Sequence, residues 1–133
     1  MTIDNNSIDS RLNPFKLAES LSEYWSPKVI SEVDEAYVKV AKLKGSFVWH
    51  QHDNEDELFY ILKGSLVMEY KDKQVNLKAG DLHVVPKGIL HNPVASVDCL
   101  VMLIENKATL HTGGNRQTSG CSIEEQLQSS NPI

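Results

Sequence analysis

Between Pro27 and Ile104 the chain consists of short segments in which apolar and polar residues alternate. Alternation with a period of two places apolar side chains on one face of a β-strand and polar side chains on the other. Turn-forming residues separate nearly all of these segments, and no helical periodicity interrupts them. The pattern predicts short antiparallel strands at residues 37–43, 47–52, 57–62, 66–70, 74–77, 82–85, 91–95 and 97–104.

Strands in this number and order bury their apolar face by closing into a barrel or by forming two packed layers. The sequence therefore predicts an all-β domain. Periodicity alone is equally compatible with a lipocalin-like barrel, a jelly roll and a sandwich.

The two ends of the chain have a different character from the middle. Residues 1–26 combine a polar arm with a short helix at 13–22, where Asn13 can cap the helix and Pro14 suits its first position. Residues 107–133 lose the alternation, apart from one or two helical turns expected at 122–125, and we expect this tail to be partly disordered. We therefore divide the chain into an arm, a barrel at residues 27–106 and a tail.

The charge and the hydropathy of the chain argue against several classes of partner. The net charge is -5 and the 13 basic residues are scattered, which argues against nucleic acid or an anionic membrane surface as a partner. The longest apolar run, residues 99–104, is far too short to span a bilayer, and the polar N-terminus does not resemble a secretory signal. We expect a cytoplasmic protein in which Cys99 is a buried thiol rather than disulfide-bonded to Cys121.

Two histidines at positions 50 and 52 are candidates for metal binding. On a strand, residues two apart face the same way, so His50 and His52 would project side by side. By itself, such a pair is more often a polar patch on the wet face of a strand. Four acids follow the pair, and any of them is a candidate further ligand: Asp53, Glu55, Asp56 and Glu57.

A longer pattern surrounds this pair. The run His50-Gln-His52-x4-Glu57-x6-Gly64 is followed by Gly80-x5-Pro86-x-Gly88-x2-His91. These two runs resemble the two motifs of the cupin superfamily, and the chain is similar to its small single-domain members, including those described as mannose-6-phosphate isomerase-like. The resemblance implies a double-stranded β-helix, or jelly-roll, barrel that binds one divalent metal ion. Carried over by position, the implied ligands are His50, His52, Glu57 and His91.

The residues themselves support Glu57 within this set. Glu57 directly precedes the apolar run 58–62, so a strand can fix its side chain, whereas Asp53, Glu55 and Asp56 lie in the preceding loop. The sequence departs from the family pattern at two positions that are not ligands. Four residues separate Gly45 from His50, one fewer than usual, and Ala95 stands where the family normally has Asn.

Three imidazoles and one carboxylate suit zinc, iron, manganese, nickel, cobalt or copper, and the sequence does not choose among them. We expect either a metal-dependent isomerase, lyase or dioxygenase acting on a small oxygen-rich or anionic substrate, or a non-catalytic metal-dependent binding module. A scaffold without metal is disfavoured because all four ligands are present. A general base requires an inward-facing side chain, and the candidates are Tyr60, Glu69, Tyr70 and His83.

We expect His83 on the outer face or at a dimer contact, and His111 in a solvated loop. The apolar residues that can line a cavity, although they are more often simple core, are Phe47, Phe59, Ile61, Leu66, Met68, Val84 and Met102. The resemblance also implies a homodimer. We expect it to form through the outer sheet that contains residues 37–43, with Tyr24 and Trp25 anchoring the N-terminal helix on the partner.

Overall fold

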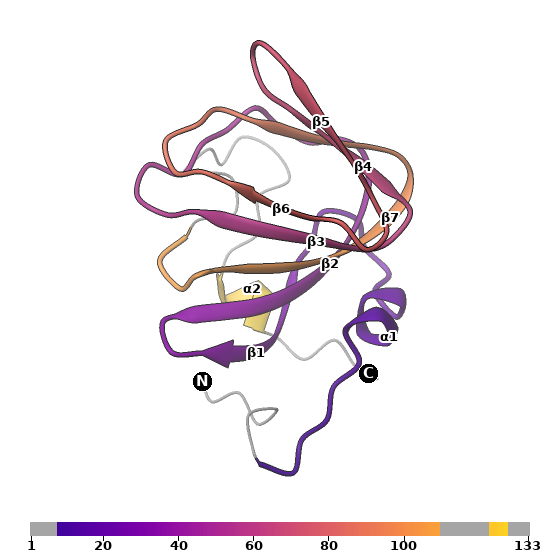
Figure 1. Ribbon diagram of the computed structural model, residues 1–133. Coiled ribbons are helices and arrows are strands. Elements are labelled where there is room, and N and C mark those ends of the chain that lie inside the picture. The colour runs from indigo at the N-terminus through magenta and orange to yellow at the C-terminus, as the bar shows by residue number, and fades with distance from the viewer. Residues whose placement is uncertain (1–7, 110–122, 128–133) are drawn as a thin grey trace.

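The computed structural model describes residues 8–109 and 123–127 (Figure 1). Its elements in chain order are α1 (Pro14–Glu19), β1 (Lys28–Val33), β2 (Ala36–Ser46), β3 (Glu57–Lys63), β4 (Ser65–Glu69), β5 (Gln74–Lys78), β6 (Leu82–Val85), β7 (Asn92–Asn106) and α2 (Ile123–Leu127). Neither helix in these ranges is long and apolar enough to cross a membrane.

All strand pairs are antiparallel, and β7 lies at the centre of the arrangement. The main sheet has the order β1-β2-β7-β3-β6, while β4 pairs with both β7 and β5. The strand β7 can serve three neighbours because it first pairs with β4, through Asn92 to Val94, and later with β3, through Leu100 to Glu105. The sheet curls around one apolar interior, which is the all-β jelly-roll fold expected of a cupin (Figure 1).

Most predicted elements are confirmed. The Asn13 side chain accepts a 3.0 Å hydrogen bond from the backbone N–H of Lys16, and Pro14 opens α1. The strands predicted at 57–62, 66–70, 74–77 and 82–85 agree with β3 to β6 to within one residue at either end. Cys99 is a buried free thiol, as expected. His111 and Cys121 lie outside the described residues.

The predicted strands differ from the observed ones at three places. The strand β1 was not predicted, and residues 47–52 form no regular strand, because β2 continues through a bulge near Gly45 and ends at Ser46. The strands predicted at 91–95 and 97–104 are the single strand β7. The exposed residues 96–98, which read as a break in the pattern, lie where β7 passes between its partners.

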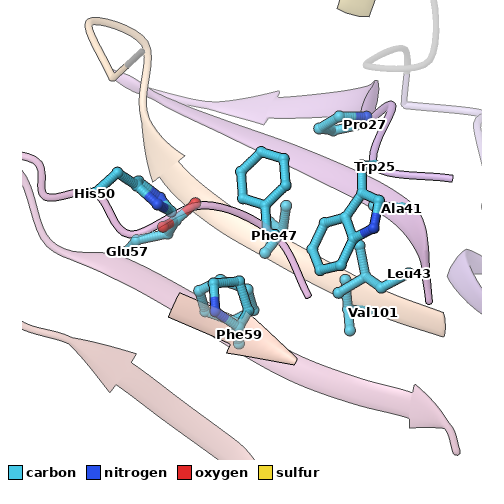
Figure 2. Close-up of a pocket in the computed structure, with 11 residues that line it drawn as sticks. Trp25, Pro27, Ala41, Leu43, Phe47, His50, Glu57, Phe59 and Val101 are labelled. Atoms are coloured by element: carbon cyan, nitrogen blue, oxygen red, sulfur yellow. The ribbon is translucent and has the colours of Figure 1, made fainter. Parts of the chain in front are cut away.

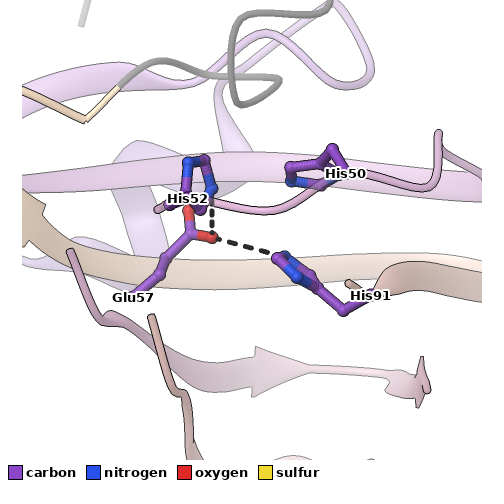
Figure 3. A group of neighbouring side chains, drawn as sticks. All are labelled: His50, His52, Glu57 and His91. Atoms are coloured by element: carbon purple, nitrogen blue, oxygen red, sulfur yellow. Dashed lines mark ion pairs between the residues drawn. The ribbon is translucent and has the colours of Figure 1, made fainter. Parts of the chain in front are cut away.

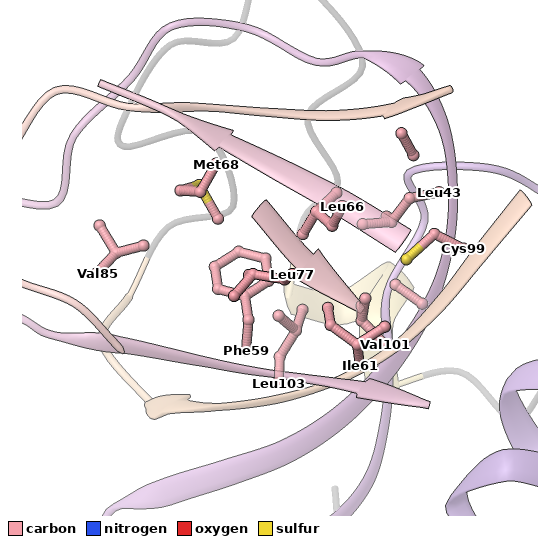
Figure 4. Packing of buried hydrophobic residues seen from close by; sticks show 12 residues of the cluster. Leu43, Phe59, Ile61, Leu66, Met68, Leu77, Val85, Cys99, Val101 and Leu103 are labelled. Carbon is pink, nitrogen blue, oxygen red and sulfur yellow. The ribbon is translucent and has the colours of Figure 1, made fainter. Parts of the chain in front are cut away.

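The interior and exterior of the main sheet are both apolar. Inside, one cluster joins the inward-facing residues of six strands, among them Leu43, Phe59, Ile61, Leu66, Leu77, Val85 and Val101 (Figure 4). Outside, α1 covers the sheet and buries Ala18 and Leu21 against Ile30, Val40 and Leu100. Both faces of β2 are therefore buried here: Lys39 and Val40 are both 1% exposed, and Lys39 shares the inner face with Ala41.

Candidate metal centre

The four residues named from the sequence motifs come together inside the barrel. One nitrogen from each of His50, His52 and His91 and one carboxylate oxygen of Glu57 lie within 4.8 Å of one another, and all four residues are buried (Figure 3). Glu57 is the first residue of β3, and His91 directly precedes β7. The starts of β3 and β7 thus position Glu57 and His91, two of the four residues.

The other half lies on an extended segment held by hydrogen bonds. The backbones of His50 and His91 form a two-way bridge, with N–H to O distances of 3.0 and 2.9 Å, and the Gly88 N–H donates to the His52 carbonyl at 2.7 Å. These bonds preserve the alternation that a strand would impose, because His50 and His52 are buried while Gln51 between them is exposed. The side-chain prediction is therefore confirmed although the strand is absent.

Two of the histidines have their ring orientation fixed. His50 Nδ1 lies 2.8 Å from the Val48 carbonyl oxygen, and His91 Nδ1 lies 2.9 Å from that of Ile89. Because a carbonyl only accepts, each Nδ1 carries the proton and donates, which leaves each Nε2 with a free lone pair. A backbone carbonyl behind the ring is the usual way in which proteins orient a metal-binding imidazole.

The inward atoms have no hydrogen-bond partners of their own. His52 Nε2, His91 Nε2 and Glu57 Oε1 are buried without a hydrogen bond, although Glu57 Oε1 lies 3.2 Å from His52 Nε2 and 3.9 Å from His91 Nε2. Ligand bonds of about 2.0–2.2 Å place neighbouring ligand atoms about 3.0–3.6 Å apart, close to these separations. The donor set, its spacing and its unpaired atoms fit a divalent metal ion.

The electrostatics of the cluster favour the metal-binding forms of His50, His91 and Glu57, whereas the raised pKa of His52 favours its protonated form in the absence of a metal. Burial, followed by the nearby His91, lowers the pKa of His50 to about 4, and burial also lowers the pKa of His91. Burial alone would raise the pKa of Glu57 and lower that of His52. The attraction between the two side chains outweighs burial, so the pKa of Glu57 is lowered and that of His52 is raised. Two histidines are thus neutral near pH 7, and Glu57 is ionised.

A small apolar pocket adjoins the cluster (Figure 2). Its volume is about 30 Å³, and among the residues that the structure describes, the ionisable ones in its lining are His50 and Glu57. The remaining lining residues are Trp25, Pro27, Ala41, Leu43, Phe47, Phe59, Pro93, Val101 and Leu103. The cluster therefore faces a hydrocarbon surface rather than a polar one.

Trp25 lines this pocket, a position that was not predicted from the sequence. Its ring stacks on Phe47 with centroids 4.6 Å apart, and its indole N–H donates to the Lys44 carbonyl at 2.8 Å. The backbone of Trp25 has φ of +56°, a left-handed conformation that a bulky residue rarely adopts. Because the Trp25 ring packs within its own chain, the predicted anchoring role on a partner does not suit it. Nothing in the sequence signals this contact.

The other acids of the first motif lie elsewhere. Asp53 accepts a 2.7 Å hydrogen bond from Gln51, and Asp56 accepts one of 2.9 Å from the backbone N–H of Lys87. Neither these two nor Glu55 joins the cluster. Among the predicted lining residues, Phe47 and Phe59 line this pocket, and Val84 lines a wider pocket that also includes His83. Ile61, Leu66 and Met68 belong to the core, and Met102 faces outward.

His83 is on the inner face, contrary to the prediction. It shares the face of β6 that buries Val85, and it lies opposite the inward-facing Phe59. A 2.7 Å hydrogen bond joins its Nε2 to the hydroxyl of Tyr70, which also packs against the core. By the same alternation, Tyr60 and Glu69 face outward. Tyr70 and His83 are therefore the inward-facing members of the predicted set of bases.

Three buried polar residues next to the cluster have no clear signal in the sequence. Lys39 Nζ forms a 2.9 Å ion pair with Glu105 Oε1 and a hydrogen bond with the Gln126 side chain. Glu105 is the cross-strand neighbour of Glu57. The only sequence signal is that a charged residue ends the apolar run of β7, which is also what an ordinary strand end looks like.

Comparisons with known proteins agree with this architecture. The family model described as Cupin domain matches residues 36–105. The uncharacterized protein YdbB of Bacillus subtilis (strain 168) is 35% identical over 96 residues, which make up 71% of this chain and 85% of that protein.

Two solved structures extend the likeness to the fold. A cupin-2 domain containing protein from Shewanella frigidimarina is 36% identical, with a TM-score of 0.70 over 72% of this chain and 94% of that one. Protein NMB1881 from Neisseria meningitidis is 26% identical, with a TM-score of 0.67 over 74% of this chain and 100% of that one. The barrel, the two motifs and these matches together show that the chain belongs to the cupin superfamily.

Proposed function

We propose that this cupin is a metal-dependent enzyme in which His50, His52, Glu57 and His91 hold one divalent transition-metal ion. The observation that carries the proposal is the convergence of four buried ligand atoms within 4.8 Å, three of them without hydrogen-bond partners. Leaving polar atoms buried and unpaired is costly, so such a cluster persists where an ion satisfies it.

An ion held by these four residues would supply Lewis-acid chemistry toward substrate oxygens or, if it were redox-active, chemistry with dioxygen. The chain's own residues favour the second reaction class. The pocket beside His50 and Glu57 is apolar, and its volume of about 30 Å³ suits a molecule of the size of dioxygen or water. We therefore propose a dioxygenase as the first candidate, acting on a small molecule with paired oxygens or a carboxylate.

The Tyr70–His83 pair supports a second candidate, an isomerase or lyase that moves a proton. Val85 pairs with Glu57 and His83 pairs with Phe59, so His83 is the diagonal neighbour of Glu57. Diagonal neighbours on a sheet lie about 7–8 Å apart, which is within the reach of a small substrate held at the cluster. Burial lowers the pKa of His83, so its imidazole is neutral near pH 7 and can accept a proton.

A wider pocket at this pair has room for the substrate. It has a volume of about 540 Å³ and includes Tyr70, His83, Lys71 and Lys73 in its lining. Asp72 lines the pocket as well, so its two lysines leave one excess positive charge, which favours an anionic group at the outer end of the substrate.

We also propose a homodimer in the cytoplasm. Leu82 and Val84, on the outer face of the edge strand β6, are 58% and 40% exposed, which favours a contact there. The predicted contact through residues 37–43 is less suitable, because β2 is paired on both sides and the free edge belongs to β1. Light scattering of the purified protein measures the mass directly.

Elemental analysis of the purified protein tests the metal site. We expect about one equivalent of a transition metal, lost in the double variant His50→Ala/His91→Ala. His83→Ala is the matched control, since it removes an inward-facing histidine outside the cluster and should retain the metal. A wild-type protein that holds no metal and takes none up on reconstitution would sink the proposal.

Turnover distinguishes the candidates. Iron-loaded protein that consumes dioxygen with small dihydroxy compounds or hydroxy acids supports the dioxygenase. Oxygen-independent conversion that is lost in Tyr70→Phe and His83→Gln, with metal content unchanged, supports the isomerase or lyase. Metal and ligand binding without turnover would leave the non-catalytic binding module.

A further inference from the structure

Lys39, Glu105 and Gln126 form a buried polar network at the metal end of the barrel. The side chains of Lys39 and Glu105 are 2% and 3% exposed, and their charged atoms lie 2.9 Å apart. Gln126, from α2, is 2% exposed and accepts a hydrogen bond from the Lys39 ammonium. A second contact holds α2 in place, since Lys28 Nζ donates to the Glu125 carbonyl at 3.2 Å.

The register of the sheet places this network directly against the candidate ligands. Glu105 on β7 lies opposite Glu57 on β3, and burial, followed by repulsion from the Glu57 carboxylate, raises the pKa of Glu105 to about 8. The charge of Glu105 also acts on His52. Lys39 lies one strand further along, on β2, whose pairing with β7 brings it beside Glu105. The order across the interior is therefore Glu57, Glu105, Lys39 and then α2.

Stability alone does not account for this network. Replacing a buried ion pair by apolar residues of similar volume is often neutral or stabilising, because the pair has to be desolvated. The same three strands place Ala41, Phe59 and Leu103 at the next inward positions, so apolar packing is readily available here. Glu105 also keeps its second oxygen, Oε2, buried without a partner.

We propose that Lys39, Glu105 and Gln126 are positioning residues for the metal site. Lys39 pairs with Glu105, and its ammonium group offsets the repulsion between the neighbouring carboxyl groups of Glu105 and Glu57. Gln126 ties α2 to this end of the barrel through its hydrogen bond with Lys39. The inference rests on the proposed metal site. It extends that site to α2, which lies beyond the residues 36–105 that match the family model.

Cobalt(II) binding to the metal-free protein tests the proposal without any substrate. The double variant Lys39→Met/Glu105→Leu removes the Lys39–Glu105 pair as a unit, so neither partner is left buried and alone. We expect Co²⁺ affinity to fall about 10–100-fold, the usual effect of losing groups that orient metal ligands. We also expect a changed visible absorption spectrum of the bound Co²⁺, with thermal stability of the metal-free protein equal or higher.

Two further variants keep the test sharp. Met68→Leu/Leu77→Met changes two inward residues of the apolar cluster and should leave Co²⁺ affinity and spectrum unchanged. Gln126→Leu removes only one partner of Lys39, so we expect a smaller loss of Co²⁺ affinity. If the double variant does not fold, this single variant tests whether the network positions the metal ligands. Wild-type affinity and spectrum in both network variants would overturn the inference, whereas a wild-type protein that binds no Co²⁺ would overturn the metal site itself.

Discussion

The two ends of the barrel interior are built on the same three strands but carry opposite chemistry. At one end β2, β3 and β7 place Leu43, Ile61 and Val101 inward, in the apolar cluster (Figure 4). At the other end the same strands place Lys39, Glu57 and Glu105 inward, each of them at most 5% exposed. The backbone arrangement is common to both ends, so the side chains alone separate an apolar end from a polar one.

The difference is energetic as well as chemical. Apolar burial stabilises a fold by roughly 25 cal/mol per Å² of surface removed from water. Buried charges and unpaired polar atoms oppose folding unless partners compensate them. We therefore expect substitutions at the apolar end to change stability and substitutions at the polar end to change metal binding.

The largest expected effect concerns Cys99, which is fully buried at the apolar end. Burial raises the pKa of its thiol to about 12, from an ordinary 9.0, so at pH 8 the reactive thiolate is about a thousandfold rarer than in a free thiol. Iodoacetamide should modify Cys99 at least that much more slowly in the native protein than in urea, in a Cys121→Ser background that isolates this thiol. The rate should rise about tenfold per pH unit. If the modification rates of the native and the denatured protein lay within tenfold of each other, the Cys99 thiol would not be protected by burial.

Next in size is a cavity at the apolar end. Ile61 is 0% exposed, so Ile61→Ala should lower the free energy of unfolding by about 2–5 kcal/mol, measured by urea titration. Metal affinity should stay within a few-fold of wild type. The polar-end variant Lys39→Met/Glu105→Leu should show the reverse pattern. Equal losses of stability in the two variants would mean that the ends do not divide these roles.

A smaller effect is expected at the turn between β3 and β4. Gly64 has φ of +84°, and a Cβ there would lie 2.4 Å from the Asp98 carbonyl oxygen. Gly80 also has a positive φ, of +94°, but a Cβ there would meet nothing within 4 Å. Gly64→Ala should therefore destabilise by about 2–3 kcal/mol and Gly80→Ala by only about 1 kcal/mol. Chemical denaturation of both variants checks the difference, which disappears if the turn can shift freely.

The smallest effect is expected for Tyr70→Phe, which removes one half-buried hydrogen bond, to His83. Loss of such a bond costs about 0.5–1.5 kcal/mol. Metal content should not change, since the hydroxyl is not part of the cluster. Differential scanning calorimetry and elemental analysis measure the two quantities, and loss of metal would place Tyr70 in the site after all.

The motif residues could be predicted from sequence because their signal is local. The one-residue spacing of His50 and His52, and the position of Glu57 immediately before an apolar run, each fix a side chain relative to its own strand or segment. The remaining histidine, His91, was named only through the resemblance to the second motif of the cupin superfamily. Four of the eight predicted strands were also correct to within one residue, because each lies between clear turn signals.

The rest depends on contacts between distant segments. Alternation cannot assign Lys39, because α1 covers the outer face of the sheet and buries Val40 beside it. Trp25 reaches the pocket through a left-handed backbone that only its hydrogen bonds to β2 explain. His83 was misplaced because a short, mostly exposed strand shows no clear periodicity.

X-ray absorption spectroscopy of the metal-loaded protein counts the atoms bound to the ion, so it tests directly whether three histidines and one glutamate hold it. We expect nitrogen and oxygen ligands at about 2.0–2.2 Å, with the scattering pattern of three imidazoles. In His91→Ala this pattern should fall to that of two imidazoles. A spectrum with sulfur ligands, or with no imidazole scattering, would contradict this ligand set.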